Sequence, residues 1–132
     1  MPFVGLSQNN KGDEIVDFPK KMAEFPGGED ALYQFIADNI EYPKEAREKG
    51  IQGKLFVEFI IWSDGSVGQI KVLNKIGGGC EEEVIRVIKL MPNWTPAEQG
   101  GKIVNSKFIL PIIFNLSDED KEENKNRKER RK

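Results

Sequence analysis

Two apolar alternations joined by a tight-turn signal constrain the fold of this chain more than any other feature. Apolar side chains occupy both faces of Lys54–Trp62, which is typical of a central strand rather than an edge strand. Ser63-Asp64-Gly65-Ser66 follows, and Asp-Gly between apolar runs is the strongest short signal for a hairpin. The sequence therefore predicts a β-hairpin formed by Lys54–Trp62 and Val67–Leu73.

Three other segments have the features of helices. Apolar residues recur every three or four positions in Gly28–Ile40 and in Cys80–Met91, which predicts two amphipathic helices. Pro43–Lys49 predicts a short charged helix, because proline suits a first helical position and Gly50 suits the position after the last.

The last periodic segment, Lys102–Phe114, predicts a third strand. It carries Pro111, which cannot donate to a ladder, so we expect this strand at an edge of the sheet. The expected fold is α+β, with two helices packed on one face of a small antiparallel three-stranded sheet. The expected strand order is Val67–Leu73, then Lys54–Trp62, then Lys102–Phe114.

Composition divides the 132 residues into three parts. Residues 1–22 form a polar, turn-rich leader in which Ile15–Phe18 could be a short strand that ends at Pro19. Residues 23–116 carry the periodic patterns and are long enough for one domain with its own core. Residues 117–132 are mostly charged and contain no apolar side chain, so we expect a disordered tail or a frayed helix.

The residue inventory excludes several classes of catalytic site. The chain has no histidine, which excludes Ser-His-Asp, Cys-His and imidazole–metal sites, and its single cysteine excludes an internal disulfide. Cys80 begins a helix, a position that favours a thiolate, but three glutamates follow it and oppose ionisation. We expect a partly buried free thiol, no cofactor and no metal. An enzyme that uses Cys80 is an alternative that a thiol pKa near 8.5 or above would exclude.

Other suggestive residues have plainer interpretations. Gly100-Gly101-Lys102 lacks the following Ser or Thr of a phosphate loop and leads into a strand, so we interpret it as a turn. Asp64-Gly65 lacks the spacing of a calcium loop, which again favours a turn. We expect Glu58 to pair with a lysine on a neighbouring strand, and Trp94 to pack over the open end of the sheet.

Neither a membrane span nor a nucleic-acid partner is indicated. No apolar run approaches the ~18–20 residues of a membrane helix, and the first residues lack the pattern of a signal peptide. We therefore expect either a cytoplasmic protein or a soluble piece of a longer one. The net charge of −2 gives no general reason to expect binding to nucleic acid.

An ordered set of short motifs resembles the C-terminal domain of TonB, in the form common among Bacteroidetes-type energy transducers. The resemblance covers about Ala23 to Leu116. In chain order the motifs are Phe25-Pro26-Gly27-Gly28, Tyr42-Pro43 with Ala46, Gly50-Ile51-Gln52-Gly53, Phe56-Val57-Glu58-Phe59, Asp64-Gly65-Ser66-Val67, Gly77-Gly78-Gly79-Cys80, Pro92-Asn93-Trp94-Thr95-Pro96 and Leu110-Pro111-Ile112-Ile113-Phe114. Each motif is weak alone, and their order and spacing make the resemblance specific.

The resemblance implies a non-enzymatic, periplasmic domain. Such domains carry energy from a proton-driven inner-membrane motor to outer-membrane transporters of iron chelates, vitamins or glycans. They bind an extended segment of the transporter, the TonB box, by β-strand addition. The family's membrane anchor and spacer are not in this sequence. A stand-alone peptide- or protein-binding module of another envelope system, not coupled to a motor, is therefore the alternative.

The resemblance also implies a binding site. If Lys102–Phe114 is the exposed edge strand, it is the strand that receives the TonB box, and the Tyr-Pro segment also faces the transporter. Open edges also invite pairing of two copies, so we expect a homodimer through this strand as a further contact. The expected partner-binding residues are Tyr42, Pro43, Lys102, Ile103, Val104, Asn105, Ser106, Lys107, Phe108 and Ile109.

Overall fold

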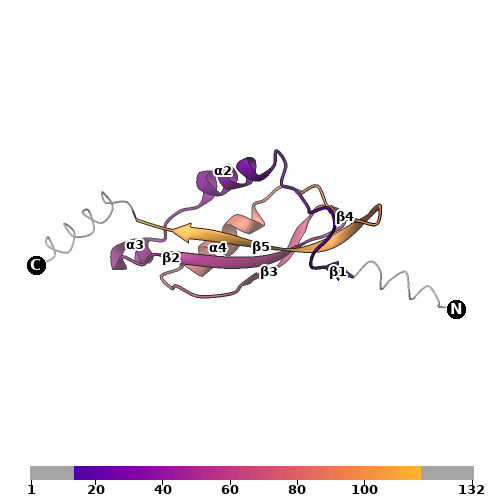
Figure 1. Cartoon of the computed structure of the whole chain (residues 1–132). Helices are drawn as coiled ribbons and strands as arrows, with labels where there is room; N and C mark the ends of the chain where they lie inside the picture. The colour runs from indigo at the N-terminus through magenta and orange to yellow at the C-terminus, as the bar shows by residue number, and fades with distance from the viewer. Residues whose placement is uncertain (1–13, 117–132) are drawn as a thin grey trace, which may run out of the picture.

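The computed structural model describes residues 14–116 as three helices and five strands (Figure 1). The expected tail at 117–132 and the first part of the leader lie outside the described residues. In chain order the elements are β1 (Ile15–Val16), α2 (Glu29–Asn39), α3 (Lys44–Lys49), β2 (Gly53–Ile61), β3 (Val67–Val72), α4 (Cys80–Lys89), β4 (Ala97–Gln99) and β5 (Lys102–Phe114).

The three long strands have the expected order and direction. β2 is central and pairs antiparallel with β3 on one side and with β5 on the other. The hairpin between β2 and β3 turns at Asp64-Gly65, where the Ser66 N–H donates to Asp64 Oδ1 at 2.9 Å. The α+β class and the antiparallel core of the sheet are therefore confirmed.

The expectation of three strands and two packed helices is wrong. β1 pairs parallel with β5 and β4 pairs antiparallel with β5, which makes a mixed five-stranded sheet. β1 confirms the short strand expected in Ile15–Phe18, although it ends at Val16 and its pairing with β5 was not foreseen. β4 has only three residues, which is too short for an alternation to be visible. The short helix α3 also packs, since its Ala46 is fully buried in the core.

The core lies between one face of the sheet and the helices. Alternate side chains of β2 are fully buried there, and α4 adds a buried stripe. Trp94 joins this core: its ring contacts the rings of Phe25, Phe59 and Phe108 at centroid distances of 5.0–5.7 Å. The predicted packing role of Trp94 is therefore confirmed.

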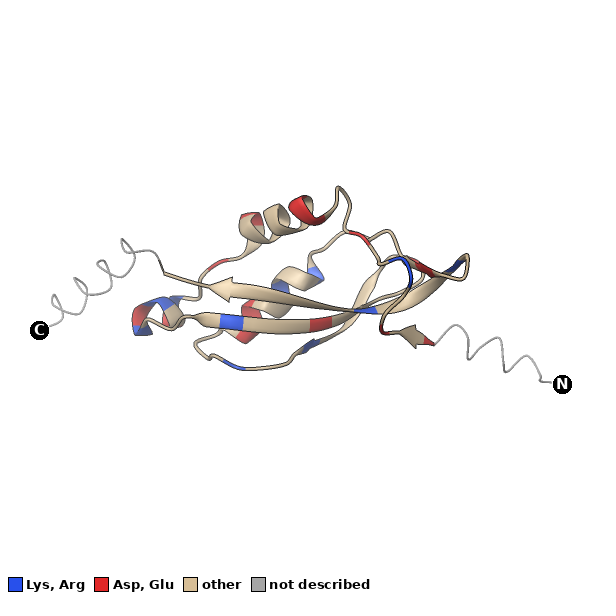
Figure 2. Ribbon diagram, in the orientation of Figure 1, with Lys and Arg blue, Asp and Glu red and all other residues tan. Residues whose placement is uncertain are grey.

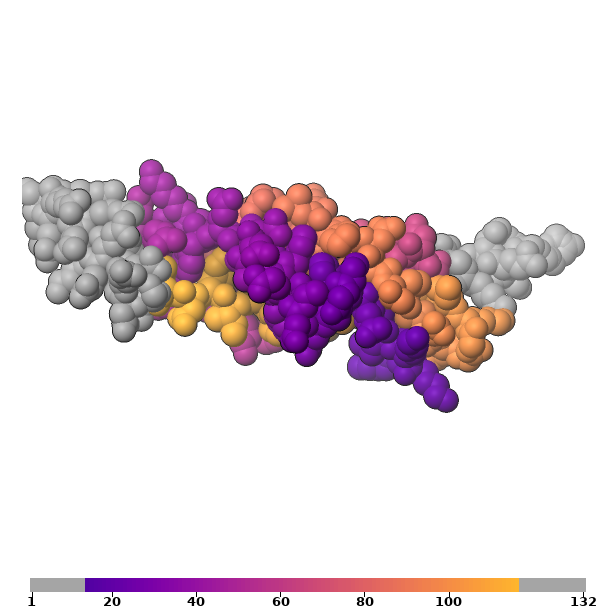
Figure 3. Space-filling model, turned by 90° about the horizontal axis from the view of Figure 1, so that it is seen from above, coloured from indigo at the N-terminus to yellow at the C-terminus, as the bar shows by residue number. Residues whose placement is uncertain are grey.

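Charged residues are dispersed over the fold. Acidic and basic positions are interspersed along the helices and strands (Figure 2), in keeping with the net charge of −2. Among residues 14–116, no helix combines the length and the apolar character that crossing a bilayer would need. Seen from above, α2 lies along the middle of the molecule, beside the later residues of β5 (Figure 3).

Candidate strand-binding edge

The first part of β5 pairs with two short strands. β4 pairs with Lys102–Val104, and β1 pairs with Asn105 and Ser106 at the edge opposite β2. The prediction that β5 is an edge strand with no further partner is therefore wrong for its first five residues. β4 is too short to show a pattern of its own. A short strand at Ile15–Phe18 was expected, but its pairing with β5 was not, because the two segments are remote in sequence.

From Lys107 to Phe114, no strand within residues 14–116 pairs with the outer edge of β5. Pro111 shows which backbone groups face outward. It lies opposite Phe56, whose N–H donates to Asn74 Oδ1 at 2.9 Å and whose carbonyl accepts from Leu73 N–H at 2.8 Å. Phe56 thus makes both bonds on the β3 side, so Pro111 faces away from β2.

Positions two residues from Pro111 share this orientation, because an unbroken antiparallel ladder alternates. Ile109 and Ile113 therefore direct their N–H and C=O groups outward, and Pro111 directs its C=O outward. Because Pro111 faces outward, its missing N–H removes no hydrogen bond between β5 and β2. An unpaired row of donors and acceptors of this kind is a template for another strand.

Two hollows lie beside this open edge. One, of about 300 Å³, lies between Phe108–Pro111 and an opposite wall that includes Phe25, Leu32 and Tyr33. The other, of about 370 Å³, lies between Lys107–Ile109 and the leader, with Phe18 and Met22 on its wall. The edge is therefore flanked by apolar side chains, and Ile109 itself is half exposed.

Lys107 is the cation at the start of the open edge. Its Nζ lies 3.5 Å from Asp17 Oδ1 and 3.9 Å from Glu58 Oε1. The predicted pairing of Glu58 with a lysine on a neighbouring strand is therefore confirmed. Because these pairs are partly exposed, we expect each to contribute less than about 1 kcal/mol to stability.

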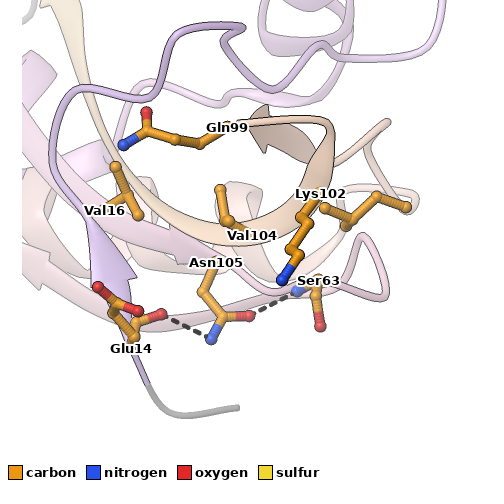
Figure 4. A pocket seen from close by; sticks show the side chains of 8 residues that line it. Glu14, Val16, Ser63, Gln99, Lys102, Val104 and Asn105 are labelled. Atoms are coloured by element: carbon orange, nitrogen blue, oxygen red, sulfur yellow. Dashed lines mark hydrogen bonds between the residues drawn. The ribbon is translucent and has the colours of Figure 1, made fainter. Parts of the chain in front are cut away.

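Asn105 ties the leader to the sheet (Figure 4). Its Nδ2 donates to the Glu14 carbonyl at 2.9 Å, and its Oδ1 accepts from the Ser63 N–H at 2.7 Å. Asn105 is 3% exposed and lines a hollow of about 370 Å³ together with Val16, Gln99 and Lys102. The sequence predicted a strand position for Asn105, and the family resemblance implied a partner-binding role, but neither predicted this contact with the leader. The polar run Asn105-Ser106-Lys107 between apolar residues was the one available signal of its role.

Tyr42 and Pro43 lie far from the first residues of β5. The Tyr42 ring meets the Phe114 ring edge-on at 5.5 Å, and its hydroxyl donates to the Ile51 carbonyl. Pro43 is the N-cap of α3. Since a strand rises about 3.3 Å per residue, Lys102 lies roughly 40 Å from this end of β5. The structure thus places the two expected parts of the site at opposite ends of one strand.

The remaining chemical candidate, Cys80, is fully buried. Burial, and after it the negative charges of Glu81, Glu82 and Glu83, raise the pKa of its thiol to about 11. A nucleophilic thiolate at neutral pH is therefore disfavoured, and the alternative of an enzyme that uses Cys80 fails its own criterion. Within residues 14–116, no group of three or more potential metal-ligating side chains comes together.

Comparisons with known proteins agree with the motif resemblance. Residues 38–116 match the family model described as Gram-negative bacterial TonB protein C-terminal. Protein TonB of Pseudomonas aeruginosa is 35% identical over 75 residues, which is 57% of this chain but only 22% of that protein.

Solved structures from two organisms are also similar to this chain. The Helicobacter pylori TonB C-terminal domain (residues 194–285, solved by NMR) is 28% identical, with a TM-score of 0.48; the alignment covers 67% of this chain and 92% of that one. The P. aeruginosa TonB C-terminal domain is 30% identical, with a TM-score of 0.45 over 59% and 79% of the two chains.

Proposed function

This chain belongs to the Gram-negative TonB C-terminal family, and from that premise we propose that it binds the TonB box of outer-membrane transporters by β-strand addition. In this role the domain lies in the periplasm and couples energy to nutrient uptake through the outer membrane, without catalysing a reaction. The inner-membrane motor would be reached through a segment outside this sequence. The chain spans about a fifth of the length of its curated relative, so transporter, cargo and motor are all part of the proposal.

The open edge of β5 from Lys107 to Phe114 is the single observation that carries the proposal. Backbone groups supply most of the affinity in strand addition, while neighbouring pockets select side chains. Here the outward groups of Ile109, Pro111 and Ile113 supply the ladder, and the flanking hollows supply the pockets. The binding set from the resemblance is retained as a proposal, with its centre moved toward Phe114, where Tyr42 and Pro43 lie.

A titration of ¹⁵N-labelled protein with synthetic TonB-box peptides tests this proposal. We expect amide shifts concentrated at Lys107–Phe114 and around Tyr42-Pro43. Ile109→Pro removes one outward donor at a position equivalent to that of Pro111, and should weaken binding about tenfold, or about 1.4 kcal/mol. Ile109→Ala keeps the donor and is the matched control.

Shifts elsewhere, or equal affinities for the two variants, would contradict strand addition at this edge. If the full chain fails to bind, the titration is repeated on a variant that ends at Leu116. Binding by that variant alone would mean that residues 117–132 mask the edge. If neither form binds the peptides, the alternative of a module with another envelope partner is favoured.

A further inference from the structure

We infer that the leader strand β1 is an internal occupant of the strand-accepting edge of β5, and that a partner segment displaces it. This inference rests on the proposed function, since it concerns access to the same edge. β1 lies alongside Asn105 and Ser106, immediately before the open section that begins at Lys107. An extended partner that continues along β5 past Lys107 would meet β1 in its path.

The contacts of β1 are those that a bound extended segment would make. Ile15 and Val16 pair in register with Asn105 and Ser106. The buried Asn105 side chain donates a hydrogen bond from Nδ2 to the Glu14 carbonyl, and the Lys107 Nζ lies 3.5 Å from the Asp17 carboxylate. Each contact uses the backbone or a short-range charge, so another extended chain with a nearby carboxylate could replace it.

β1 is bound to the sheet weakly enough to be displaced. The strand has two residues, Asp17 is more than half exposed, and Phe18 is 89% exposed. Glu14 is also exposed. A short strand with few buried apolar contacts belongs to the part of a fold that opens most easily.

The tether after β1 keeps it near the edge when it opens. Lys21 forms an isolated bridge with Glu98, and Glu24 forms one with Thr95. The four residues between Val16 and Lys21 are therefore a short linker that ends on the fold. Short tethers give effective concentrations on the order of millimolar, so β1 competes with a weakly bound partner.

β4 is not the displaced element. It is joined to β5 by the two-residue turn Gly100-Gly101, whose positive φ angles of 60° and 76° suit a tight hairpin. Its Ala97 is fully buried in the core, and its Glu98 is bridged to Lys21 on its other side. A partner that pairs with Asn105 and Ser106 therefore has to displace β1, not β4.

Val16→Pro tests the inference in the full chain, because it removes a backbone donor from β1 and leaves β2 and β5 unchanged. Val16→Ala keeps the donor and is the matched control. The first readout needs no partner: hydrogen exchange at the Asn105 and Lys107 amides, which share the outward orientation of Ile109. We expect about tenfold faster exchange at these amides in V16P, with the amides of β2 unchanged.

The second readout is binding of two peptides to the same variants. The first peptide is the chain's own Glu14–Lys20 segment at about 1 mM, which should shift Asn105–Lys107 in V16P but not in the wild type or V16A. The second is a TonB-box peptide, whose affinity should be about tenfold higher for V16P, because β1 no longer competes for Asn105 and Ser106.

The outcomes separate this inference from the proposed function. Faster exchange and binding of the Glu14–Lys20 peptide, without binding of any TonB-box peptide, would support β1 as an occupant and contradict the proposed partner. A TonB-box peptide that binds V16P and wild type equally would support the partner and overturn the inference. Unchanged exchange at Asn105 and Lys107 in V16P would overturn it as well.

Discussion

The environment of single residues already limits what this protein can do, and Cys80 shows this most directly. With a thiol pKa of about 11, only about one molecule in a thousand carries a thiolate at pH 8. We expect a thiol reagent to label the native protein slowly and the protein unfolded in guanidinium at once. Rapid labelling under native conditions would contradict the burial of Cys80.

The raised pKa also has a consequence for stability. The thiol of the unfolded chain ionises first as pH rises past its ordinary value near 9.0, so the folded state loses stability between about pH 9 and pH 11. Urea titrations across this range should show that loss in the wild type. In Cys80→Ala, the free energy of unfolding should fall less steeply between about pH 9 and pH 11. An equally steep fall in this variant would mean that other groups cause it.

Asp64 gives a second test at the residue scale. Hydrogen bonds from the Ser66 hydroxyl and the Ser66 N–H lower the pKa of its carboxyl. We expect Ser66→Ala to move this pKa back toward the ordinary aspartate value of 3.8, as followed by carboxyl NMR titration. Because the folded pKa is depressed, the hairpin loses this contribution only as pH falls below that value. Ser63→Ala is the control, and an equal shift there would contradict the role of the hydroxyl.

At the scale of elements, the hairpin turn between β2 and β3 touches the segment that carries Trp94. A Cβ at Gly65 would lie 2.3 Å from the Trp94 carbonyl oxygen, at a φ of +90°. A Cβ at Gly100 would meet nothing within 4 Å, at a φ of +60°. Gly65→Ala should therefore cost about 2–4 kcal/mol, and Gly100→Ala only about 1 kcal/mol.

Urea unfolding of both variants measures this difference. The backbone N–H of Trp94 donates to the Gly65 carbonyl at 2.8 Å, so the turn and the segment that carries Trp94 stabilise each other. Equal losses in the two variants would mean that left-handed strain alone decides the cost.

The same elements show how much of the fold the sequence can predict. β5 begins and ends where the alternation predicts, and β2, β3 and α4 differ by at most two residues. These elements carry their own period, turn and cap signals. β4 carries almost none of these signals, and the sequence around β1 predicts a short strand but not its pairing with β5.

At the scale of the whole molecule, the candidate site depends on distances that local patterns do not encode. Ile15 and Asn105 are 90 positions apart in the chain and pair in the sheet. Their pairing determines where the open edge begins. Conversely, Lys102 and Tyr42 are both suggested by motifs, yet they lie at opposite ends of β5. Motifs therefore indicate β5 as the candidate strand, and only tertiary structure shows which section of it is open.

An open edge of this kind also has a consequence for self-association, and the expected homodimer can be tested on it. Two copies can pair their Lys107–Phe114 edges about a two-fold axis. Ile113 is 65% exposed at this edge, whereas the similarly exposed Ile103 (57%) lies where β4 already pairs. In sedimentation velocity, we expect the wild type and Ile103→Lys to exceed the monomer mass of 15.0 kDa as concentration rises.

Ile113→Lys should remain a monomer over the same range, because a charge at an edge opposes pairing with another strand. A TonB-box peptide that occupies the edge should also return the wild type to a monomer. If Ile103→Lys alone blocks association, the contact lies at the other end of β5. If the wild type stays monomeric at every concentration, Lys107, Pro111 and the flanking leader are sufficient to protect the edge, and only a partner able to enter the neighbouring hollows can use it.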